Sequence, residues 1–259
     1  MQTIALPAPV FATAPDARLT ERYGFIPTHE LVTAFEREDW VVTGASTKKV
    51  RKPEKDGLQR HLVRFAHRSQ LDTGRTERIE TLLINSHDGT SSLQLGAGVF
   101  RFACANGIIV ADSTVATVRL GHHKLDMDTV LNSAHQILGQ AEIVSGTIEA
   151  WKGIELDTET TVRLAQAGID LRWGNSDDAP VRADQLANLT RREADQGNDL
   201  WTVFNRVQEN VLRSGVRASR FQEGRNQLMR SPRTIKALDA TVKINRGLWE
   251  AANQIALSA

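Results

Sequence analysis

Residues 80–113 read ETLLINSHDGTSSLQLGAGVFRFACANGIIVADS, and the rest of the chain is organised around this stretch. An apolar run at residues 82–84 ends at a polar corner, residues 85–90. A second apolar run, residues 93–104, alternates in part with a period of two, and Asn106-Gly107 is typical of a two-residue hairpin turn before a last apolar run. The pattern predicts strands at the centre of an antiparallel sheet.

The apolar positions of these strands are expected to form the core. Six of them should be mostly buried: Leu83, Leu95, Val99, Phe102, Cys104 and Ile109. Cys104 is the single cysteine of the chain, so it forms no internal disulfide and is interpreted as a small buried apolar residue rather than a nucleophile. A single unpaired cysteine indicates a reducing compartment, and we expect a cytoplasmic protein.

Flanking patterns predict an α+β fold. Thr28 is a good N-cap for a helix over residues 28–38, and β-rich or alternating runs at residues 40–43 and 61–67 predict further strands of an antiparallel meander. After the meander the apolar period changes to about 3.6. This change predicts a long helix over residues 125–151, packed on the sheet.

Beyond this helix the chain is predicted to be helical. Asp157 or Thr158 would cap a helix that Gly168 ends, and Asp199 would cap another. Ser231-Pro232 would open the last helix, with the proline at its first position. We therefore expect three parts, namely a flexible arm (residues 1–20), an α+β core domain (21–155) and a helical C-terminal region packed on the core (156–259).

Charge is unevenly distributed, although the net charge is only +1. Residues 48–78 hold ten Lys/Arg and four Asp/Glu, a net of +6, and residues 206–246 hold ten and three, a net of +7. Residues 121–200 hold seven Lys/Arg and fourteen Asp/Glu, a net of −7. Two interpretations stay open: the basic blocks bind a polyanion, or they pair with the acidic block within or between subunits.

Several function classes lack their sequence signals. No apolar run approaches the ~20 residues of a membrane-spanning helix, so no membrane partner is expected. The chain has no GxSxG motif, Walker loop or dinucleotide fingerprint. Gly96-Ala97-Gly98 lies within a predicted strand, where it indicates a bulge or a close backbone approach rather than a phosphate cradle.

The polar corner carries the side chains that are most suggestive of chemistry. His87-Asp88-Gly89 lies at a strand end, where functional loops are common. One hypothesis is a metal-assisted hydrolase that uses Asn85, His87 and Asp88. The interpretation we favour is structural: Asp88 bonds its own turn and Gly89 supplies the positive φ angle. No catalytic residue, metal or cofactor is assigned from the sequence.

Several motifs carry a family resemblance. They are Tyr23 with Ile26-Pro27-Thr28 and Glu30, the corner Leu83–Ser91, the strand pair Gly98–Gly107 and the segment Asn205–Asn210. Over about residues 20–215 the chain resembles the phage/plasmid-like family of unknown function, whose members recur on mobile elements. The resemblance implies family membership and no established reaction. Asn85, His87, Asp88 and Asn106 are its motif residues.

The order of elements gives a looser likeness. A helix, a β-meander and a following long helix are similar to the core of single-strand annealing proteins of the phage recombinase type, which form rings with a basic groove for DNA. This likeness implies a homo-oligomer that binds single-stranded DNA in recombination. The residues expected to contact phosphates are Lys48, Lys49, Arg51, Lys52, Lys55, Arg60, Arg64, Arg68 and Arg101. An oligomeric assembly protein without nucleic acid is the third hypothesis.

Overall fold

The computed structural model of the chain describes residues 4–50, 53, 56–71, 77–101, 107–109, 118–121, 126–174, 179–213, 215–216, 219–222, 225–228 and 231–259. Two units follow one another in sequence, residues 1–142 and residues 143–259. We call them the sheet unit and the helical unit. The α+β class predicted from the sequence is confirmed.

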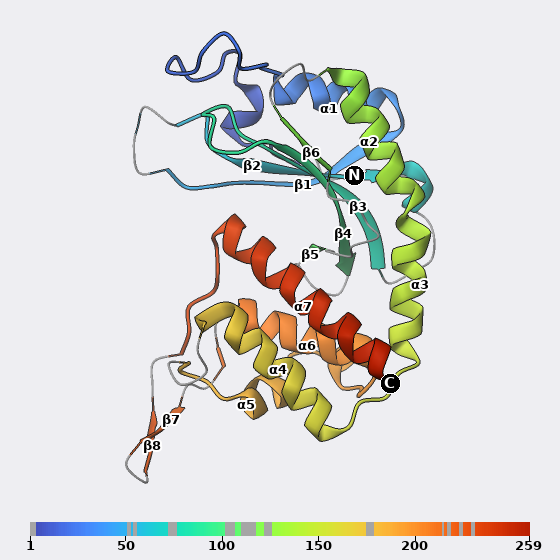
Figure 1. Cartoon of the computed structure of the whole chain (residues 1–259), viewed down its shortest axis with the longest axis vertical. Coiled ribbons are helices and arrows are strands. Elements are labelled where there is room, and N and C mark those ends of the chain that lie inside the picture. Colours follow the sequence, from blue (N-terminus) through green and yellow to red (C-terminus); the bar gives the residue numbers. More distant parts are fainter. Residues whose placement is uncertain are drawn as a thin grey trace. The chain divides into compact units, whose positions relative to one another are not determined.

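The sheet unit is built on an antiparallel meander (Figure 1). Consecutive strands are neighbours in the order β1 (Trp40–Thr47), β2 (His61–His67), β3 (Glu77–Asn85), β4 (Leu93–Arg101) and β5 (Gly107–Ile109), and β6 (Val118–Leu120) also pairs with β4. A bulge interrupts the β1–β2 register between Val42 and Gly44. Phe100 pairs with Gly107. Gly107 therefore belongs to β5, and the predicted two-residue turn at Asn106-Gly107 is wrong.

Two helices of this unit cover one face of the sheet, α1 (Thr28–Arg37) and α2 (Met127–Gly139) (Figure 1). The Phe35 ring of α1 lies 4.5 Å from the Phe65 ring and 5.6 Å from the Trp40 ring, measured between centroids. Beneath the helices Leu83, Leu95 and Val99 are 0% exposed, as predicted. Of the other predicted core residues, Phe102 and Cys104 lie outside the described residues, as does the side chain of Ile109.

The N-terminal segment lies along the sheet unit. A short 3₁₀ turn, η1 (Ala8–Phe11), buries Val10 completely, and the Asp16 amide donates to the His87 carbonyl over 2.9 Å. The polar corner at the end of β3 therefore receives a hydrogen bond from a residue more than sixty positions earlier in the chain.

The long helix predicted over residues 125–151 is divided. α2 ends at Gly139, where the Gln140 amide bonds the Ile137 carbonyl over 3.1 Å, and α3 (Ala141–Lys152) begins directly afterwards. Trp151 of α3 packs against Trp249, 4.5 Å between ring centroids, and against Phe204, 5.4 Å. The second half of the predicted helix therefore contributes to the core of the helical unit.

The helical unit packs its helices around that aromatic core. They are α4 (Thr158–Trp173), α5 (Ala183–Asn188), α6 (Leu200–Leu212) and α7 (Leu238–Ser258). The predicted caps are confirmed: Asp157 accepts from the Thr160 amide over 2.7 Å, and Asp199 accepts from the Thr202 amide over 2.9 Å. A two-stranded hairpin, β7 (Ser219–Gln222) and β8 (Arg225–Leu228), was not predicted.

Two predicted helix ends in this unit are wrong. α4 continues through Gly168 and ends at Trp173, and Gly174 caps it with φ +82°. The last helix begins at Leu238 rather than at Ser231-Pro232. The Ile235 amide donates to the Leu212 carbonyl over 2.8 Å, so the chain before α7 satisfies a carbonyl at the end of α6 instead of starting a helix.

Candidate nucleic-acid interface

The predicted phosphate-binding residues start at the end of β1. Lys48 and Lys49 are exposed, and the Lys48 amide donates to the Arg60 carbonyl over 2.9 Å, which extends the β1–β2 ladder. The two lysines border a hollow of about 460 Å³, lined by Thr47, Lys48, Lys49, Val50, Pro53, Asp56 and Gln59. Three other predicted residues, Arg51, Lys52 and Lys55, lie outside the described residues.

Strand register gathers several arginines on the sheet face opposite α1 and α2. Arg64 pairs with Leu82, and Gln94 pairs with Arg119. Since alternate residues of a strand share a face, Arg60, Arg64, Arg78 and Arg119 lie on this face together with Glu80. The same face carries the buried apolar residues Leu62, Leu82 and Ile84. Glu80 is the acidic residue of this face among the described strand positions. We call these four arginines and Glu80 the basic sheet face.

A shared carboxylate holds two of these arginines. Arg78 donates to Glu80 Oε1 from Nε over 2.9 Å and from Nη2 over 2.6 Å, and Arg64 Nε lies 3.6 Å from Oε2. The Glu80 side chain is 0% exposed, whereas those of Arg64 and Arg78 are 24% and 18% exposed. Burial lowers the pKa of Arg64, Glu80 raises it, and Arg78 lowers it further.

A small residue in β1 makes room for the Arg64 side chain. Arg64 Nη2 donates to the Thr43 carbonyl over 2.9 Å, and a Cβ atom on Gly44 would lie 2.3 Å from this nitrogen. Gly96 and Gly98 of β4 lie on the same face by register. The guanidinium of Arg64 therefore packs against the backbone of Gly44 in the neighbouring strand.

Two predicted contact residues do not join this group. Arg68 follows β2 in the 3₁₀ turn η3 (Arg68–Gln70) and forms an exposed ion pair with Asp39, 3.3 Å between Nε and Oδ1. Arg101 pairs with Glu77, which places it on the face that the helices cover. Its side chain lies outside the described part of the structure. The sequence predicted Arg60, Arg64 and Arg68 on one face, and the structure keeps only Arg60 and Arg64 there.

The polar corner divides into a surface turn and a buried group. Asp88 Oδ1 accepts from the Thr90 amide over 3.1 Å and from the Thr90 hydroxyl over 2.5 Å, and Gly89 adopts φ +72°. Asn85 and His87 are completely buried. Asn106, the last motif residue, lies outside the described residues. Asp88 thus bonds its own turn, as the structural interpretation predicted.

Thr28 joins the buried side chains. Its hydroxyl oxygen lies 2.9 Å from His61 Nε2, 3.1 Å from His87 Nε2 and 3.1 Å from Asn85 Nδ2. The sequence predicted Thr28 as the N-cap of α1, but Pro27 occupies that position. The hydroxyl instead connects the start of α1 to β2 and to the end of β3. We call Thr28, His61, Asn85 and His87 the buried corner.

Hydrogen-bond counting assigns the protons of the buried corner. His61 Nδ1 faces the Gln59 carbonyl at 2.9 Å and must donate to it, so Nε2 of the neutral ring accepts from the Thr28 hydroxyl. The two lone pairs of that hydroxyl then accept from Asn85 Nδ2 and from His87 Nε2–H. Burial lowers the pKa of His61, which agrees with a neutral ring.

Tyr23 contacts the backbone between two residues of the buried corner, Asn85 and His87. Its hydroxyl donates to the Ser86 carbonyl over 2.9 Å. Burial, followed by the nearby charge of Asp88, raises the pKa of Tyr23 to about 12, so the phenol stays protonated. Among the described residues no three His, Cys, Asp or Glu side chains are arranged to hold a metal ion. The buried corner is built to connect secondary-structure elements, and this weakens the hydrolase hypothesis.

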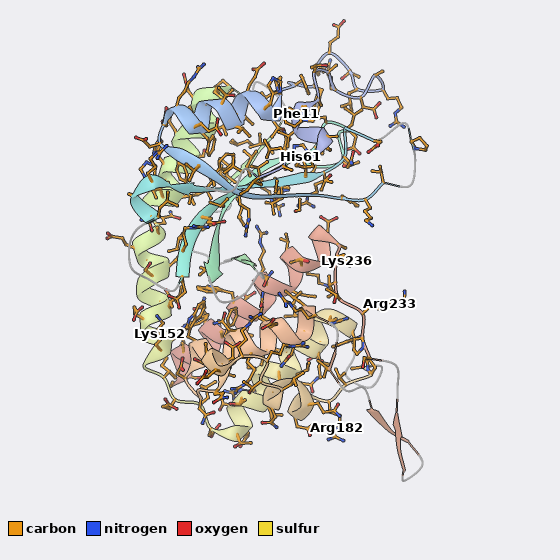
Figure 2. The ribbon with its side chains drawn as sticks, turned by 180° about the vertical axis from the view of Figure 1, so that it is seen from behind. Phe11, His61, Lys152, Arg182, Arg233 and Lys236 are labelled. Atoms are coloured by element: carbon orange, nitrogen blue, oxygen red, sulfur yellow. The ribbon has the colours of Figure 1, made fainter. Side chains whose placement is uncertain are left out.

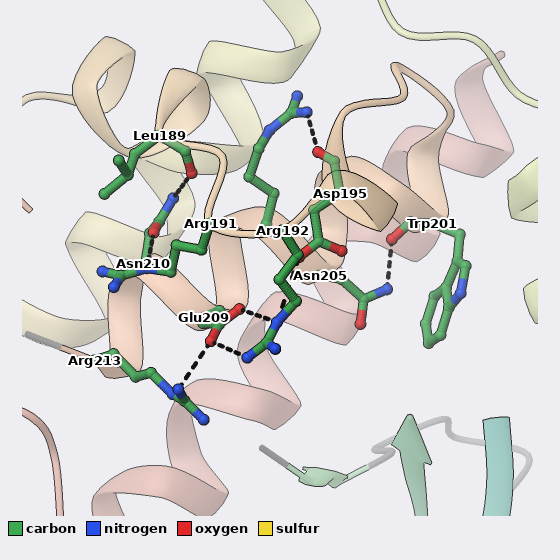
Figure 3. Close-up of polar contacts among 10 residues, drawn as sticks. Leu189, Arg191, Arg192, Asp195, Trp201, Asn205, Glu209, Asn210 and Arg213 are labelled. Carbon is green, nitrogen blue, oxygen red and sulfur yellow. Dashed lines mark hydrogen bonds and ion pairs between the residues drawn. The ribbon is translucent and has the colours of Figure 1, made fainter. Parts of the chain in front are cut away.

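A second polar group, which sequence reasoning missed as a site, surrounds α6 (Figure 3). Glu209 accepts from Arg192, 2.8 Å from Nη2 to Oε1 and 3.2 Å from Nε to Oε2, and Arg213 Nη1 lies 3.2 Å from Oε1. Asn210 accepts from Arg191 Nε over 2.7 Å. We call Arg191, Arg192 and Arg213 the arginine cluster. The segment Asn205–Asn210 contributes Glu209 and Asn210, so the resemblance was a signal for this group.

Among the residues that the structure describes, no helix combines the length and the apolar character needed to cross a membrane.

Comparisons with known proteins agree on a family. Residues 17–249 match a family described as "Domain of unknown function (DUF932)". Two Escherichia coli K12 proteins, "UPF0380 protein YfjQ" and "UPF0380 protein YafZ", are each 33% identical to the chain over 246 residues. Each alignment covers 95% of this chain and 87% of the relative. No solved structure is significantly similar. These names specify no activity.

Proposed function

Because the chain belongs to the DUF932 family, whose description assigns no activity, we propose a function from its charged surfaces. The protein binds single-stranded DNA through phosphate groups, along the basic sheet face and over Lys48 and Lys49. It acts in the annealing of complementary strands during recombination on mobile elements, as a homo-oligomer. The annealing role rests on the order of elements and on the resemblance to mobile-element proteins.

The observation that carries the proposal is the excess of positive charge on one face of the sheet. Arg64 and Arg78 share the single carboxylate of Glu80, and Arg60 and Arg119 lie on the same face. Burial and Arg78 together lower the pKa of Arg64 by more than Glu80 raises it. A further anion nearby would therefore stabilise the charged form of Arg64. Phosphate groups of a nucleic-acid backbone supply such anions at regular spacing.

The placement of the tryptophans supports binding through the backbone rather than through the bases. Four of the five, Trp40, Trp151, Trp201 and Trp249, are at most 3% exposed. Their rings therefore cannot serve as stacking platforms, which are the usual source of sequence-tolerant base contacts. Affinity for DNA should accordingly depend strongly on salt and weakly on base composition.

The test replaces the two lysines. In Lys48→Glu/Lys49→Glu, two exposed cations are lost without disturbing the core, so binding of an oligothymidylate should weaken at every salt concentration. The slope of log K against log [salt] should become less negative by roughly 1.4, since each single-strand contact contributes about 0.7. Fluorescence anisotropy at four or more salt concentrations measures both quantities.

The matched control is Lys152→Glu/Arg182→Glu, which changes the net charge equally at two exposed, ion-paired positions of the helical unit (Figure 2). It should keep the wild-type slope. A folded Lys48→Glu/Lys49→Glu variant with an unchanged slope would remove the lysines from the interface. Absence of wild-type binding at low salt would reject the proposal and favour the assembly hypothesis.

A further inference from the structure

The arginine cluster brings together three guanidinium groups from two separate segments. Arg191 and Arg192 precede the 3₁₀ turn η5 (Glu193–Asp195), and Arg213 follows the last residue of α6. All three are oriented by the last turns of α6, where the side chain of Glu209 is 4% exposed (Figure 3). The Arg192 and Arg213 side chains are 27% and 33% exposed, so solvent reaches both.

Three guanidinium groups meet two buried carboxylates here, because Arg192 Nε lies 3.9 Å from Asp195 Oδ2 in addition to its pairing with Glu209. The charges of these five groups sum to +1. Burial lowers the pKa of Arg191, Glu209 raises it, and Arg213 and Arg192 both lower it. The arrangement resembles that of Arg64 in the sheet unit, but with two neighbouring cations in place of one. Moreover, Arg191 donates through Nε to the neutral amide oxygen of Asn210, a hydrogen bond that adds no negative charge.

The cluster is held in place by buried groups. Asn210 is 1% exposed, and its Oδ1 accepts the hydrogen bond from Arg191. Its Nδ2 donates to the Leu186 carbonyl over 2.8 Å and to the Leu189 carbonyl over 2.7 Å. Gly215, with φ +96°, lies beside the Arg191 guanidinium, since a Cβ there would be 3.6 Å from Nη1. Arginine positions fixed before binding reduce the entropy cost of binding an anion.

We propose that Arg191, Arg192 and Arg213 form a binding site for one phosphate group. Arginine suits this ligand because its planar, forked donors match the oxygens of a phosphate. Single-stranded DNA and a free phosphate compound present the same chemistry, and the experiment separates them. The site lies in the helical unit, so it does not depend on the interface proposed for the sheet unit.

A purely structural role is the competing explanation. Arg213, one turn after Glu209, and Arg192 would then only neutralise a buried carboxylate at the negative end of the α6 dipole. Arg192 is unsuited to a test, because its removal weakens the pairing of buried Glu209 and risks unfolding. Arg191→Gln and Arg213→Gln leave the bidentate pair between Arg192 and Glu209 intact.

The experiment compares Arg191→Gln, Arg213→Gln and the control Arg182→Gln in the full chain. Arg182 belongs to the same unit and pairs one-to-one with Asp184, so its replacement removes an equal charge outside the cluster. Circular dichroism checks folding. Each protein is titrated at low salt with an oligothymidylate, followed by anisotropy, and with inorganic phosphate, followed by the thermal shift that binding to the native state produces.

If the site binds DNA phosphates, Arg191→Gln and Arg213→Gln each lower oligothymidylate affinity by about three- to tenfold, and Arg182→Gln leaves it unchanged. If it binds a free phosphate compound, the same variants lose the phosphate-dependent thermal shift and keep wild-type DNA affinity. If both folded variants keep the wild-type DNA affinity and the wild-type phosphate-dependent thermal shift, the proposed phosphate site is rejected. A loss confined to Lys48→Glu/Lys49→Glu would support the sheet-unit interface and reject this one.

Discussion

At the scale of single residues, Thr28 is central to the sheet unit. One hydroxyl contacts His61, His87 and Asn85, which come from two different strands and from the corner that follows them. The ring of His87 also packs edge-on against Phe25, 4.9 Å between centroids. The motif residues of this corner are therefore buried because they tie α1 to the sheet.

Replacing Thr28 tests this role. Thr28→Val keeps the shape but leaves the buried donors of Asn85 and His87 without their acceptor, and His61 without its donor. We expect the free energy of unfolding to fall by about 2–4 kcal/mol, since each unsatisfied buried polar group costs about 1–3 kcal/mol. Urea denaturation followed by circular dichroism measures the change.

Thr28→Ser is the matched control. It retains the hydroxyl and removes one methyl group, so a loss of about 1 kcal/mol is expected. Equal losses in the serine and valine variants would show that packing of the methyl group, rather than the hydrogen bonds, stabilises this corner.

At the scale of elements, α6 organises the helical unit through polar side chains that are buried. Arg206 Nη1 donates to the Asp195 and Gly197 carbonyls over 2.8 and 3.0 Å, and Gln208 Nε2 donates to Asn245 Oδ1 of α7 over 2.9 Å. Asn210 similarly bonds carbonyls at and just after the end of α5. Since buried carbonyls need partners, these side chains determine the path of the segment from residue 189 to residue 199.

Two glycines in helices of this unit should respond oppositely to alanine. Gly168 lies where α4 meets α6, and a Cβ there would be 2.6 Å from Val211 Cγ2. Gly146 in α3 is exposed, with nothing within 4 Å of its Cβ position. We expect Gly168→Ala to destabilise by about 1–3 kcal/mol, because valine is stiff in a helix, and Gly146→Ala to stabilise by about 0.5–1 kcal/mol.

Urea denaturation of both variants measures this pair of changes. A stabilised Gly168→Ala protein would show that α4 and α6 can separate slightly at no cost. In that case the close approach of the two helices would not be a requirement of the fold.

At the scale of the whole molecule, titratable groups are divided between the units. All seven histidines, residues 29, 61, 67, 87, 122, 123 and 135, belong to the sheet unit. His61 is neutral in the folded state, with a pKa below its ordinary value of 6.5. Below pH 6.5 the unfolded chain therefore binds a proton that the folded chain excludes.

The consequence is a pH dependence confined to one unit. Stability from His61 is fully present above pH 6.5 and is lost as the pH falls through the folded-state pKa, so the sheet-unit melting temperature should drop between pH 7.5 and 5. Scanning calorimetry measures the melting temperature. Thr28→Val should shift the transition of the sheet unit and Gly168→Ala that of the helical unit, which identifies each transition. His61→Gln should reduce the pH dependence of the sheet-unit melting temperature. An equal drop in the melting temperature of the helical unit would contradict the prediction.

Local patterns in the sequence determined much of this protein. Period-two runs predicted the meander, helical spacing predicted α1, and Asp157, Asp199 and Asp88-Gly89 predicted two caps and a turn. Each signal depends on residues within a few positions of one another, so it can be read without knowing the fold. The basic run from Lys48 to Arg68 was likewise evident from composition alone.

Tertiary structure alone decided where these signals meet. Thr28 forms hydrogen bonds with His61 and His87, which follow it by 33 and 59 positions, instead of capping its own helix. Gly168 contacts α6 instead of ending α4. The register of β2, β3 and β4 separates Arg64 from Arg101, and packing around α6 brings Arg191 to Arg213. These outcomes depend on contacts between distant segments, whose geometry is established only when the chain has folded.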